Sequence, residues 1–471
     1  MNGKSLRSLN ESVSRILFEE DGKSSQQKKI GTYRTRFFHL CPGAQQVFPE
    51  IEDEIGGKDA GALAKMADKI FQIEDTVLKA GEPNEQASST AREVYGQLMK
   101  AARRFGVDDK LDFMQGHLDI IDRGSKDEED EKKPGMSGMG MRGFAGDMGG
   151  SLDGGEPNDK VLIIDGLNTF IRVFSVIPTT NEDGIHIGGI VGFLRSIGYV
   201  INMIRPTRVI IAFDGKGGSN RRRKIYPEYK QNRKTKYRVN RSNSFASQDD
   251  EKMNMIMQIQ RVVEYLDTLP VTVLSYDNIE ADDTIGYICR QVLTDSKITI
   301  MSTDKDFLQL ANGRIKIWSP TKKKMYDEDK VLDEYGISSH NYIWYRVLDG
   351  DKSDNISGVR GFGLKTIQKK LPFLSENRIV KLDEVVDELP EHKDTIELNY
   401  KLMQLSDVDI SGSTKTKIID AVNSPINRLI KFKFEKMFLE DKLFTALPNV
   451  TSWLLNNFNQ LNSYAEKTHN K

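Results

Sequence analysis

Nine acidic residues stand where the sequence passes from one expected element to the next. Four of them follow short β-branched runs, and three more crowd into the stretch "IEADD" at the head of an apolar run with helical spacing. At an effective dielectric constant of about 20, two like charges about 4 Å apart repel by roughly 4 kcal/mol, so such a set needs a cation. The set is Asp165, Asp214, Glu280, Asp282, Asp283, Asp304, Asp306, Asp351 and Asp354.

The chemistry that suits this set is metal-dependent phosphodiester hydrolysis. Oxygen ligands without histidine or cysteine select hard cations, so the acids predict Mg²⁺ or Mn²⁺ rather than zinc. Two such ions about 4 Å apart form the standard arrangement, in which one helps to generate hydroxide and the other stabilises the leaving oxygen. The sequence contains neither a P-loop nor a dinucleotide fingerprint, and none of its six histidines suggests a Ser/His/Asp arrangement. A single aspartate after a strand is more often a turn or cap residue.

The elements that must position these acids alternate between strands and helices. The runs "KVLIID", "RVIIAFD", "VTVLSYD" and "KITIMSTDKD" predict strands that end in aspartate, and patterns such as "GGIVGFLRSIGYVINMI" predict helices between them. This alternation indicates an α/β fold with a parallel sheet and helices on both faces. Ligands gather at the carboxyl ends of such strands, where Asp165, Asp214, Asp304 and Asp306 fall. After about residue 340 the pattern turns helical.

A strongly basic stretch lies between Asp214 and the next helix. From Arg221 to Arg241, ten Lys and Arg residues stand against the single acid Glu228, with tyrosines interleaved. A solvated loop is the plain alternative, but the position beside the acids favours contact with phosphates and stacking on bases. Lys230 and Arg233 are placed to balance charge on the scissile phosphate. The residues expected to contact DNA here are Arg221, Arg222, Arg223, Lys224, Tyr229 and Lys234.

The glycines of "ISGVRGFGLKT" form a second candidate contact with nucleic acid. Gly358, Gly361 and Gly363 permit a tight hairpin between two helices, whose exposed amides and carbonyls suit a phosphate backbone or a monovalent cation. The segment "GDKSDN" just upstream would bring Asp351 and Asp354 beside the acids.

The first 123 residues predict a separate helical module. Apolar stripes at 6–16, 63–77 and 94–105 follow helical spacing and are expected to be core, while residues 124–159 read as a flexible linker that is first acidic and then rich in Gly and Met. The whole sequence has a net charge of −1 and only two cysteines, Cys41 and Cys289. It shows neither an apolar run long enough to span a bilayer nor the pattern of a signal peptide. We therefore expect a cytoplasmic protein. It would be the host cytoplasm if the protein is viral.

Taken in order, "IIDGLN", "IAFDG", "YPEYKQNR", "IEADDTIGYI", "STDKDF" and "GDKSDNISGVRGFGLKT" resemble the 5′ nucleases of the flap endonuclease family, and most closely the bacteriophage enzymes. The likeness covers roughly residues 160 to 400. It implies a PIN-like catalytic domain at 160–340 with a basic arch at about 216–250, followed at 341–471 by a helix-three-turn-helix DNA-binding region and C-terminal helices.

The resemblance also assigns roles to residues. All nine acids would bind two Mg²⁺ or Mn²⁺ ions, and Asp283 is the acid most readily assigned to a position without direct contact to a metal ion. Asp165, Lys230 and Arg233 would be catalytic. Tyr229 would stack on a base. The segment 358–365, including Lys365, would hold K⁺ and contact the DNA backbone.

These features lead to one hypothesis and its rivals. The leading one is a structure-specific 5′ nuclease that removes flaps or RNA primers during DNA replication or repair, acting as a monomer on branched, nicked or RNA-primed DNA. The alternative is a non-catalytic module that binds branched DNA within a replication complex. The N-terminal module or the C-terminal tail would bind other replication proteins, or the module would be the remnant of a fusion.

Overall fold

The computed structural model describes residues 42–80, 84–112, 114–123, 155–231, 239–240, 245 and 247–469. The chain divides into two compact units, one at residues 21–151 and the other carrying residues 152–471. The helix expected at 6–16, Cys41 and nearly all of the proposed linker lie outside the described residues.

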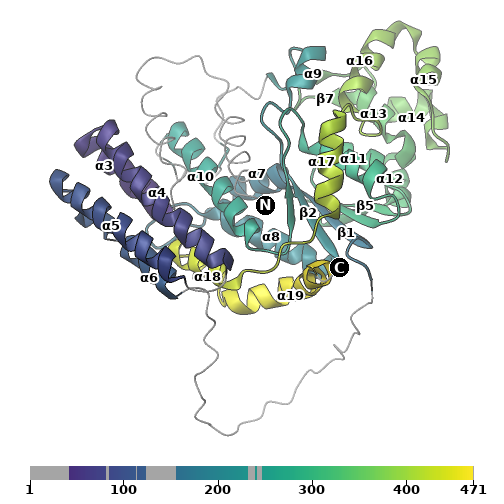
Figure 1. The fold of residues 1–471 in the computed structure, drawn as a ribbon. Coiled ribbons are helices and arrows are strands. Elements are labelled where there is room, and N and C mark those ends of the chain that lie inside the picture. The colour runs from purple at the N-terminus through teal and green to yellow at the C-terminus, as the bar shows by residue number, and fades with distance from the viewer. Residues whose placement is uncertain are drawn as a thin grey trace. The chain divides into compact units, whose positions relative to one another are not determined.

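The unit at 21–151 is helical (Figure 1). Its elements are α3 (Pro42–Ile55), α4 (Gly57–Ala80), α5 (Glu85–Phe105), the 3-10 turn η1 (Asp109–Leu111) and α6 (Met114–Arg123). The Asn84 side chain caps α5 by accepting hydrogen bonds from two backbone amides, and α5 ends at Gly106 in the left-handed conformation. Leu63, Ile70 and Leu98 are at most 1% exposed, which confirms the expected core. Phe105 corrects the expectation, because it is 42% exposed where α5 ends.

The second unit is built on a six-stranded sheet with strand order β3-β2-β1-β4-β5-β6. The strands are β1 (Lys160–Asp165), β2 (Arg208–Ala212), β3 (Thr272–Leu274), β4 (Lys297–Met301), β5 (Ile315–Ser319) and β6 (Lys324–Tyr326). Strands β1 to β5 are parallel, and β6 is antiparallel to β5. The four predicted strands are thus confirmed, whereas the expectation of a wholly parallel sheet is wrong, because β5 and β6 add an unforeseen hairpin.

Helices cover both faces of the sheet (Figure 1). Side chains alternate along a strand, so Val161 and Ile163 of β1 enter one core while Leu162 and Ile164 enter the other. The second of these cores includes α7 (Gly166–Val176), α8 (Gly188–Ile204), α10 (Gln248–Asp267), α18 (Lys431–Glu440) and α19 (Val450–His469). The helix predicted from "GGIVGFLRSIGYVINMI" is α8, with the predicted bounds.

The opposite core carries the elements that follow the acidic motifs. They are α11 (Ala281–Tyr287), the π-helical turn η3 (Ile288–Val292), the 3-10 helix η4 (Lys305–Leu310), α12 (Glu328–Tyr335), α13 (Tyr342–Asp349), α14 (Leu364–Lys370), α15 (Leu382–Glu388), α16 (Lys393–Met403) and α17 (Gly412–Asn423). Between α13 and α14 stands a short antiparallel pair, β7 (Gly350–Asp351) and β8 (Ile356–Ser357). A further short helix, α9 (Asn220–Ile225), lies in the basic stretch.

The C-terminal helices return to the α10 side of the sheet. Arg261 of α10 is 7% exposed and forms ion pairs with Glu264, Glu440 and Asp441 at 2.7, 2.7 and 2.8 Å. Cys289 is buried, and burial raises the pKa of its thiol to about 12. No helix in the described part of the chain has the length and apolar character needed to cross a membrane.

Candidate active site

Three aspartates meet at the carboxyl ends of the central strands, and we call them the acidic centre: Asp165, Asp282 and Asp304. Asp165 ends β1 and accepts a 3.1 Å hydrogen bond from the backbone amide of Asn168 in α7. Asp304 follows β4 and caps η4 by accepting a 2.8 Å bond from the amide of Asp306. Because β1 and β4 pair in parallel, these two acids reach the same edge, and Asp282 in the first turn of α11 repels both.

Burial and mutual repulsion raise the pKa values throughout the acidic centre. Burial raises the pKa of Asp165 to about 7, and repulsion from Asp214 and Asp304 adds to the effect. Burial also raises the pKa of Asp304, and it raises that of Asp282 well above the usual range. Among the ion pairs of the described residues, none joins a Lys or Arg to a member of the acidic centre. Lys230 attracts Asp282 and Arg346 attracts Asp304 from a distance, but the pKa values of both acids stay raised. The described cations therefore only partly offset the repulsion within the centre.

Asp214 stands at the edge of the acidic centre. It follows β2, which pairs with β1, and its Oδ1 accepts a 2.7 Å hydrogen bond from the backbone amide of Ala281 at the start of α11. The described residues contain no ready-made cluster of three or more His, Cys, Asp or Glu side chains around a single metal position. The donor set nevertheless fits a hard divalent cation, because its members are oxygen ligands that are buried or partly buried and repel one another.

Glu280 and Asp283, on either side of Asp282, are neutralised by Arg222. This arginine is 3% exposed. Its Nη1 and Nη2 lie 2.9 and 2.8 Å from the two carboxylate oxygens of Asp283, and Nη1 also pairs with Glu280. Burial alone would raise the pKa of Glu280, but Lys230 and Arg222 outweigh it and lower the pKa to about 2. Both acids were expected to bind metal, yet each is held by a buried cation.

Arg346 of α13 neutralises Asp306 and Asp351 in the way that Arg222 neutralises Glu280 and Asp283. Its Nε lies 2.5 Å from Asp306 Oδ1, and its Nη2 pairs with Asp351. Burial raises the pKa of Asp306 to about 7, with repulsion from Asp304 adding to it and Arg346 opposing it. For Asp351, burial is outweighed by hydrogen bonds from Ser353 and by Arg346, so its pKa falls below the usual value. Two further predicted ligands are therefore ion-paired.

Asp354 is contacted by the two residues at the base of the predicted arch. The Tyr229 hydroxyl donates a 3.0 Å hydrogen bond to Asp354, and Lys230 Nζ lies 3.9 Å from the same oxygen while it also pairs with Glu280. Lys230 adopts a positive φ of 56°. Tyr229 is only 3% exposed and its ring is packed in the core. Its expected stacking on a base stays a prediction, and it would require the ring to leave this packing.

Some side chains of the basic stretch pair with carboxylates inside the protein instead of facing solvent. Arg222 is buried among carboxylates, so this structure gives its side chain a structural role, and its expected contact with DNA stays a prediction. Arg221 lies 3.3 Å from both carboxylate oxygens of Asp283, whereas Lys224 is exposed. Arg233 and Lys234 lie outside the described residues, so their expected contacts stay predictions.

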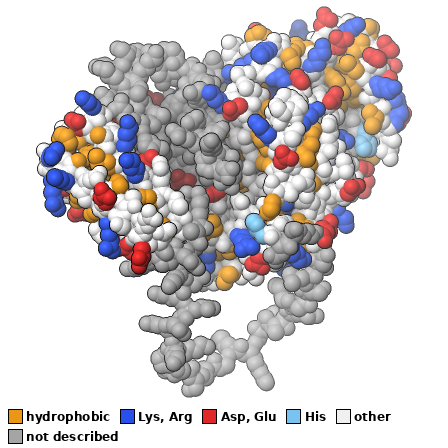
Figure 2. Space-filling model, viewed as in Figure 1, with side chains coloured by type: hydrophobic (Ala, Val, Ile, Leu, Met, Phe, Trp, Pro, Cys, Tyr) orange, Lys and Arg blue, Asp and Glu red, His pale blue; other side chains and the backbone are white. Residues whose placement is uncertain are grey.

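The predicted glycine hairpin forms the loop 358–363 between β8 and α14. A Cβ at Gly358 would lie 2.3 Å from the carbonyl oxygen of Asp349, and Gly361 has a φ of +85°, so both positions require glycine. Gly363 precedes α14 with ordinary dihedrals and open space around it. Lys365 is exposed. Figure 2 shows charged side chains of both signs over the region where Figure 1 places α14 and α15. The loop thus presents backbone and charge to solvent.

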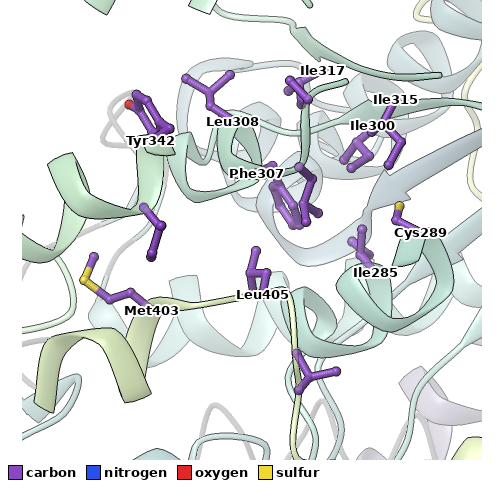
Figure 3. Close-up of a cluster of buried hydrophobic side chains, with 14 of the residues drawn as sticks. Ile285, Cys289, Ile300, Phe307, Leu308, Ile315, Ile317, Tyr342, Met403 and Leu405 are labelled. Carbon is purple, nitrogen blue, oxygen red and sulfur yellow. The ribbon is translucent and has the colours of Figure 1, made fainter. Parts of the chain in front are cut away.

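Three residues that sequence reasoning missed hold this site together. Ser302 donates a 3.0 Å hydrogen bond to Asp165, and Arg346 bridges two acids. Gln309 of η4 bonds the backbone of Met403 and Leu405, beside the apolar cluster of Figure 3. Only Arg346 left a signal, since it is a lone cation in the apolar helical stretch "YIWYRVL".

Part of this chain is similar in sequence to known proteins. Residues 160–336 match the model of the 5′-3′ exonuclease, N-terminal resolvase-like domain. The chain is 30% identical to a 5′-3′ exonuclease of Aquifex aeolicus (strain VF5) over 292 residues, which are 60% of this chain and 95% of that protein. It is 31% identical to DNA polymerase I of Caldicellulosiruptor bescii over 245 residues, 50% of this chain but only 26% of that polymerase.

Among solved structures, a flap endonuclease of bacteriophage T5 in complex with DNA and metal ions is 21% identical, with a TM-score of 0.42, over 60% of this chain and 99% of that one. The sequence match to the Aquifex aeolicus enzyme spans nearly all of that enzyme's length. The chain therefore belongs to the 5′-3′ exonuclease family of flap endonuclease type and is a phosphodiester hydrolase.

Proposed function

We propose that this nuclease cleaves at 5′ flaps, nicks or RNA primers of branched duplex DNA, using two Mg²⁺ or Mn²⁺ ions. The observation that carries the proposal is the acidic centre, whose three aspartates come from separate elements and have no ion-paired Lys or Arg among the described residues. Asp165 is buried, and Asp282 and Asp304 are partly buried. Burying like charges without compensation is strongly unfavourable. A function that brings in divalent cations explains why the acids are kept.

The acids near the carboxyl ends of the strands are proposed to have two different roles. Asp165, Asp214, Asp282 and Asp304 are the residues proposed to hold the ions, while Arg222 and Arg346 hold the neighbouring acids in place. When bound, the ions would supply an activated water and stabilise the leaving oxygen. The PIN-like description of this domain is part of the same proposal.

Lys230 is proposed to contact the scissile phosphate together with Arg233. Its side chain is 12% exposed and pairs with Glu280 in this structure. If Lys230 turns to a phosphate, Glu280 keeps its partner Arg222, so the move does not leave a buried carboxylate without a cation.

The region after α13 is proposed to grip duplex DNA as a helix-three-turn-helix element. Supporting features are the loop 358–363, which requires glycine at Gly358 and Gly361, and the exposed side chains of Arg360, Lys365 and Lys369 around it. The same loop is the proposed K⁺ site.

In the cell, the proposed role is the removal of RNA primers or flaps in replication or repair, with the unit at 21–151 or the C-terminal helices binding a replication protein. A protein that only binds branched DNA would gain nothing from an acidic centre whose members lack an ion-paired cation, because carboxylates repel phosphates.

The experiment that tests the function compares Asp304→Asn with Asp295→Asn on 5′-labelled flap, nicked and RNA-primed substrates. Asp295 is exposed and serves as the control. We expect Asp304→Asn to bind the flap substrate as the wild type does and to cleave it at least about 100-fold more slowly, a loss typical of catalytic charge, with Asp295→Asn unchanged. Cleavage by Asp304→Asn at the wild-type rate would contradict the proposal.

A further inference from the structure

Arg222 joins segments that are far apart in the chain. Besides its contacts with Glu280 and Asp283, its Nε donates a 2.8 Å hydrogen bond to the carbonyl oxygen of Leu402, at the end of α16. One guanidinium therefore ties α9, the first turn of α11 and the C-terminal end of α16 together. All three nitrogens of its planar guanidinium donate to these acceptors, and a lysine cannot reproduce that geometry.

The first turn of α11 is enclosed from other sides too. The backbone amide of Ala281 donates to Asp214 at 2.7 Å. At Gly286 a Cβ would lie 2.9 Å from the carbonyl oxygen of Leu405, so α11 and the segment after α16 approach as closely as their backbones allow. Small displacements of this turn are therefore resisted by packing, and its rotation is resisted by Arg222.

The segment 402–405 also fastens η4, which carries the other side of the acidic centre. Gln309 Nε2 donates to the carbonyl oxygen of Met403 at 3.0 Å, and Gln309 Oε1 accepts from the amide of Leu405 at 3.0 Å. In Figure 3 Met403 and Leu405 lie in the same buried cluster as Phe307 of η4. The helix that bears Asp282 and the turn that begins at Asp304 are thus held against one common segment.

We propose that Arg222 is a positioning residue of the nuclease: by fixing Glu280 and Asp283 and the end of α16, it orients Asp282 toward Asp165 and Asp304 for divalent cation binding. Successive residues of an α-helix point about 100° apart. Clamping the carboxylates on both sides of Asp282 therefore fixes the direction of the side chain between them. The inference rests on the proposed function, since it concerns the ions that the acidic centre would hold.

The chain offers a matched control in Arg261. It is also buried, it pairs with three carboxylates where Arg222 pairs with two, and it also lies near a backbone carbonyl, Met437 O at 3.4 Å. Its partners belong to α10 and to the end of α18, so it has no contact with the acidic centre. Replacing either arginine by lysine keeps the charge and removes the fork.

The test measures kcat, KM for a 5′-flap substrate, the Mg²⁺ concentration that gives half-maximal rate, and the melting temperature. Variants are Arg222→Lys and Arg261→Lys, each in the full chain. Loss of a residue that orients a metal ligand typically costs about 10- to 100-fold in affinity or activity. We expect Arg222→Lys to need at least about tenfold more Mg²⁺, with lower kcat and an unchanged KM for DNA, and Arg261→Lys to lose only melting temperature.

Equal Mg²⁺ requirements in the two variants would overturn the positioning role. That result leaves the proposed function standing as long as the wild type needs divalent ions, whereas wild-type cleavage in EDTA would defeat the proposed function itself. The two failures are therefore distinct.

Asp283→Asn supplies a second route that does not depend on the folding of Arg222→Lys. It removes the bidentate partner but leaves the pair between Arg222 and Glu280, and we expect its Mg²⁺ requirement to rise at least about threefold, a partial loss of the same clamp. An unchanged requirement would contradict the proposal. In the double variant the two effects should be less than additive, because both break one contact, and full additivity would count against the clamp.

Discussion

Ser302 donates a hydrogen bond of 3.0 Å from its hydroxyl to Oδ2 of Asp165, and its oxygen accepts another of 3.0 Å from the backbone amide of Asp304. Ser302 is 1% exposed. A single hydroxyl thus connects the end of β1 to the turn that follows β4, and it fixes two members of the acidic centre relative to each other.

Replacing Ser302 by alanine tests this link. The hydrogen bond favours the charged form of Asp165, so its loss should raise the pKa of that carboxyl further and weaken cation binding. We expect a rise in the Mg²⁺ concentration for half-maximal cleavage of about tenfold at pH 7, which shrinks at pH 9 where the carboxyl is ionised. A requirement that stays at the wild-type value at both pH values would show that the hydroxyl plays no part in orienting the acids.

The acidic centre also predicts how stability depends on pH. The folded-state pKa of Asp165 and of Asp306 is raised to about 7, so between about pH 4 and pH 7 the folded protein holds protons that the unfolded chain has released. In that window the free energy of unfolding falls as pH rises, and it levels off above about pH 7. The pKa of Glu280 is lowered to about 2, so this group makes the free energy of unfolding rise with pH. Its effect is confined to pH values below the usual pKa of a glutamate.

Thermal melts of the metal-depleted protein check this expectation. The wild type should melt higher at pH 5.5 than at pH 8, Asp165→Asn should show a smaller difference, and Mg²⁺ should reduce the wild-type difference by stabilising the protein at pH 8. A wild type that melts higher at pH 8 without metal, or an Asp165→Asn variant with the full difference, would contradict the assignment.

Strands with aspartate at their ends could be predicted from the sequence because β-branched runs and turn residues are local signals. Parallel strands carry their carboxyl ends to one edge, so the meeting of Asp165 with Asp304 followed as well. The partners of the acids could not be read in this way. Nothing in the run "RRRK" distinguishes Arg222, which turns inward, from Lys224, which stays exposed, because that choice depends on where α11 and α16 lie.

The hairpin of β5 and β6 escaped prediction for a related reason. Its strands are short and its turn, "PTKK", is basic rather than rich in glycine, so the local pattern is weak. The inward packing of Tyr229 likewise depends on Asp354, which lies over a hundred positions along the chain.

Arg346 should be essential for the stability of the acid pair that it bridges. Arg346→Met would leave Asp306 and Asp351 without their buried cation, which typically costs about 3 to 5 kcal/mol. Arg378→Met is the control, because Arg378 is 45% exposed and pairs with two surface glutamates, so that solvent screens the pairs and the loss should be much smaller. Urea unfolding measures both changes, and equal losses in the two variants would mean that the Arg346 pair is no stronger than a surface pair.

The glycine loop makes a separate prediction about packing. Gly358→Ala places a methyl group 2.3 Å from the carbonyl oxygen of Asp349, so the backbone must shift, at a cost of about 1 to 3 kcal/mol. Gly363→Ala meets nothing within 4 Å and should leave the free energy of unfolding nearly unchanged. Urea midpoints that fall equally in both variants would contradict the described path of the loop.

The central claim is that the acidic centre binds the divalent ions on which cleavage depends. The most direct measurement is the binding of Mn²⁺ to the metal-depleted protein, followed by electron paramagnetic resonance of the free ion, in the wild type, Asp282→Asn and Asp295→Asn. We expect saturable binding of about two ions per chain in the wild type and in Asp295→Asn, with at least one of them lost in Asp282→Asn. Equal Mn²⁺ binding by all of these proteins, or wild-type cleavage that continues without divalent ions, would contradict it.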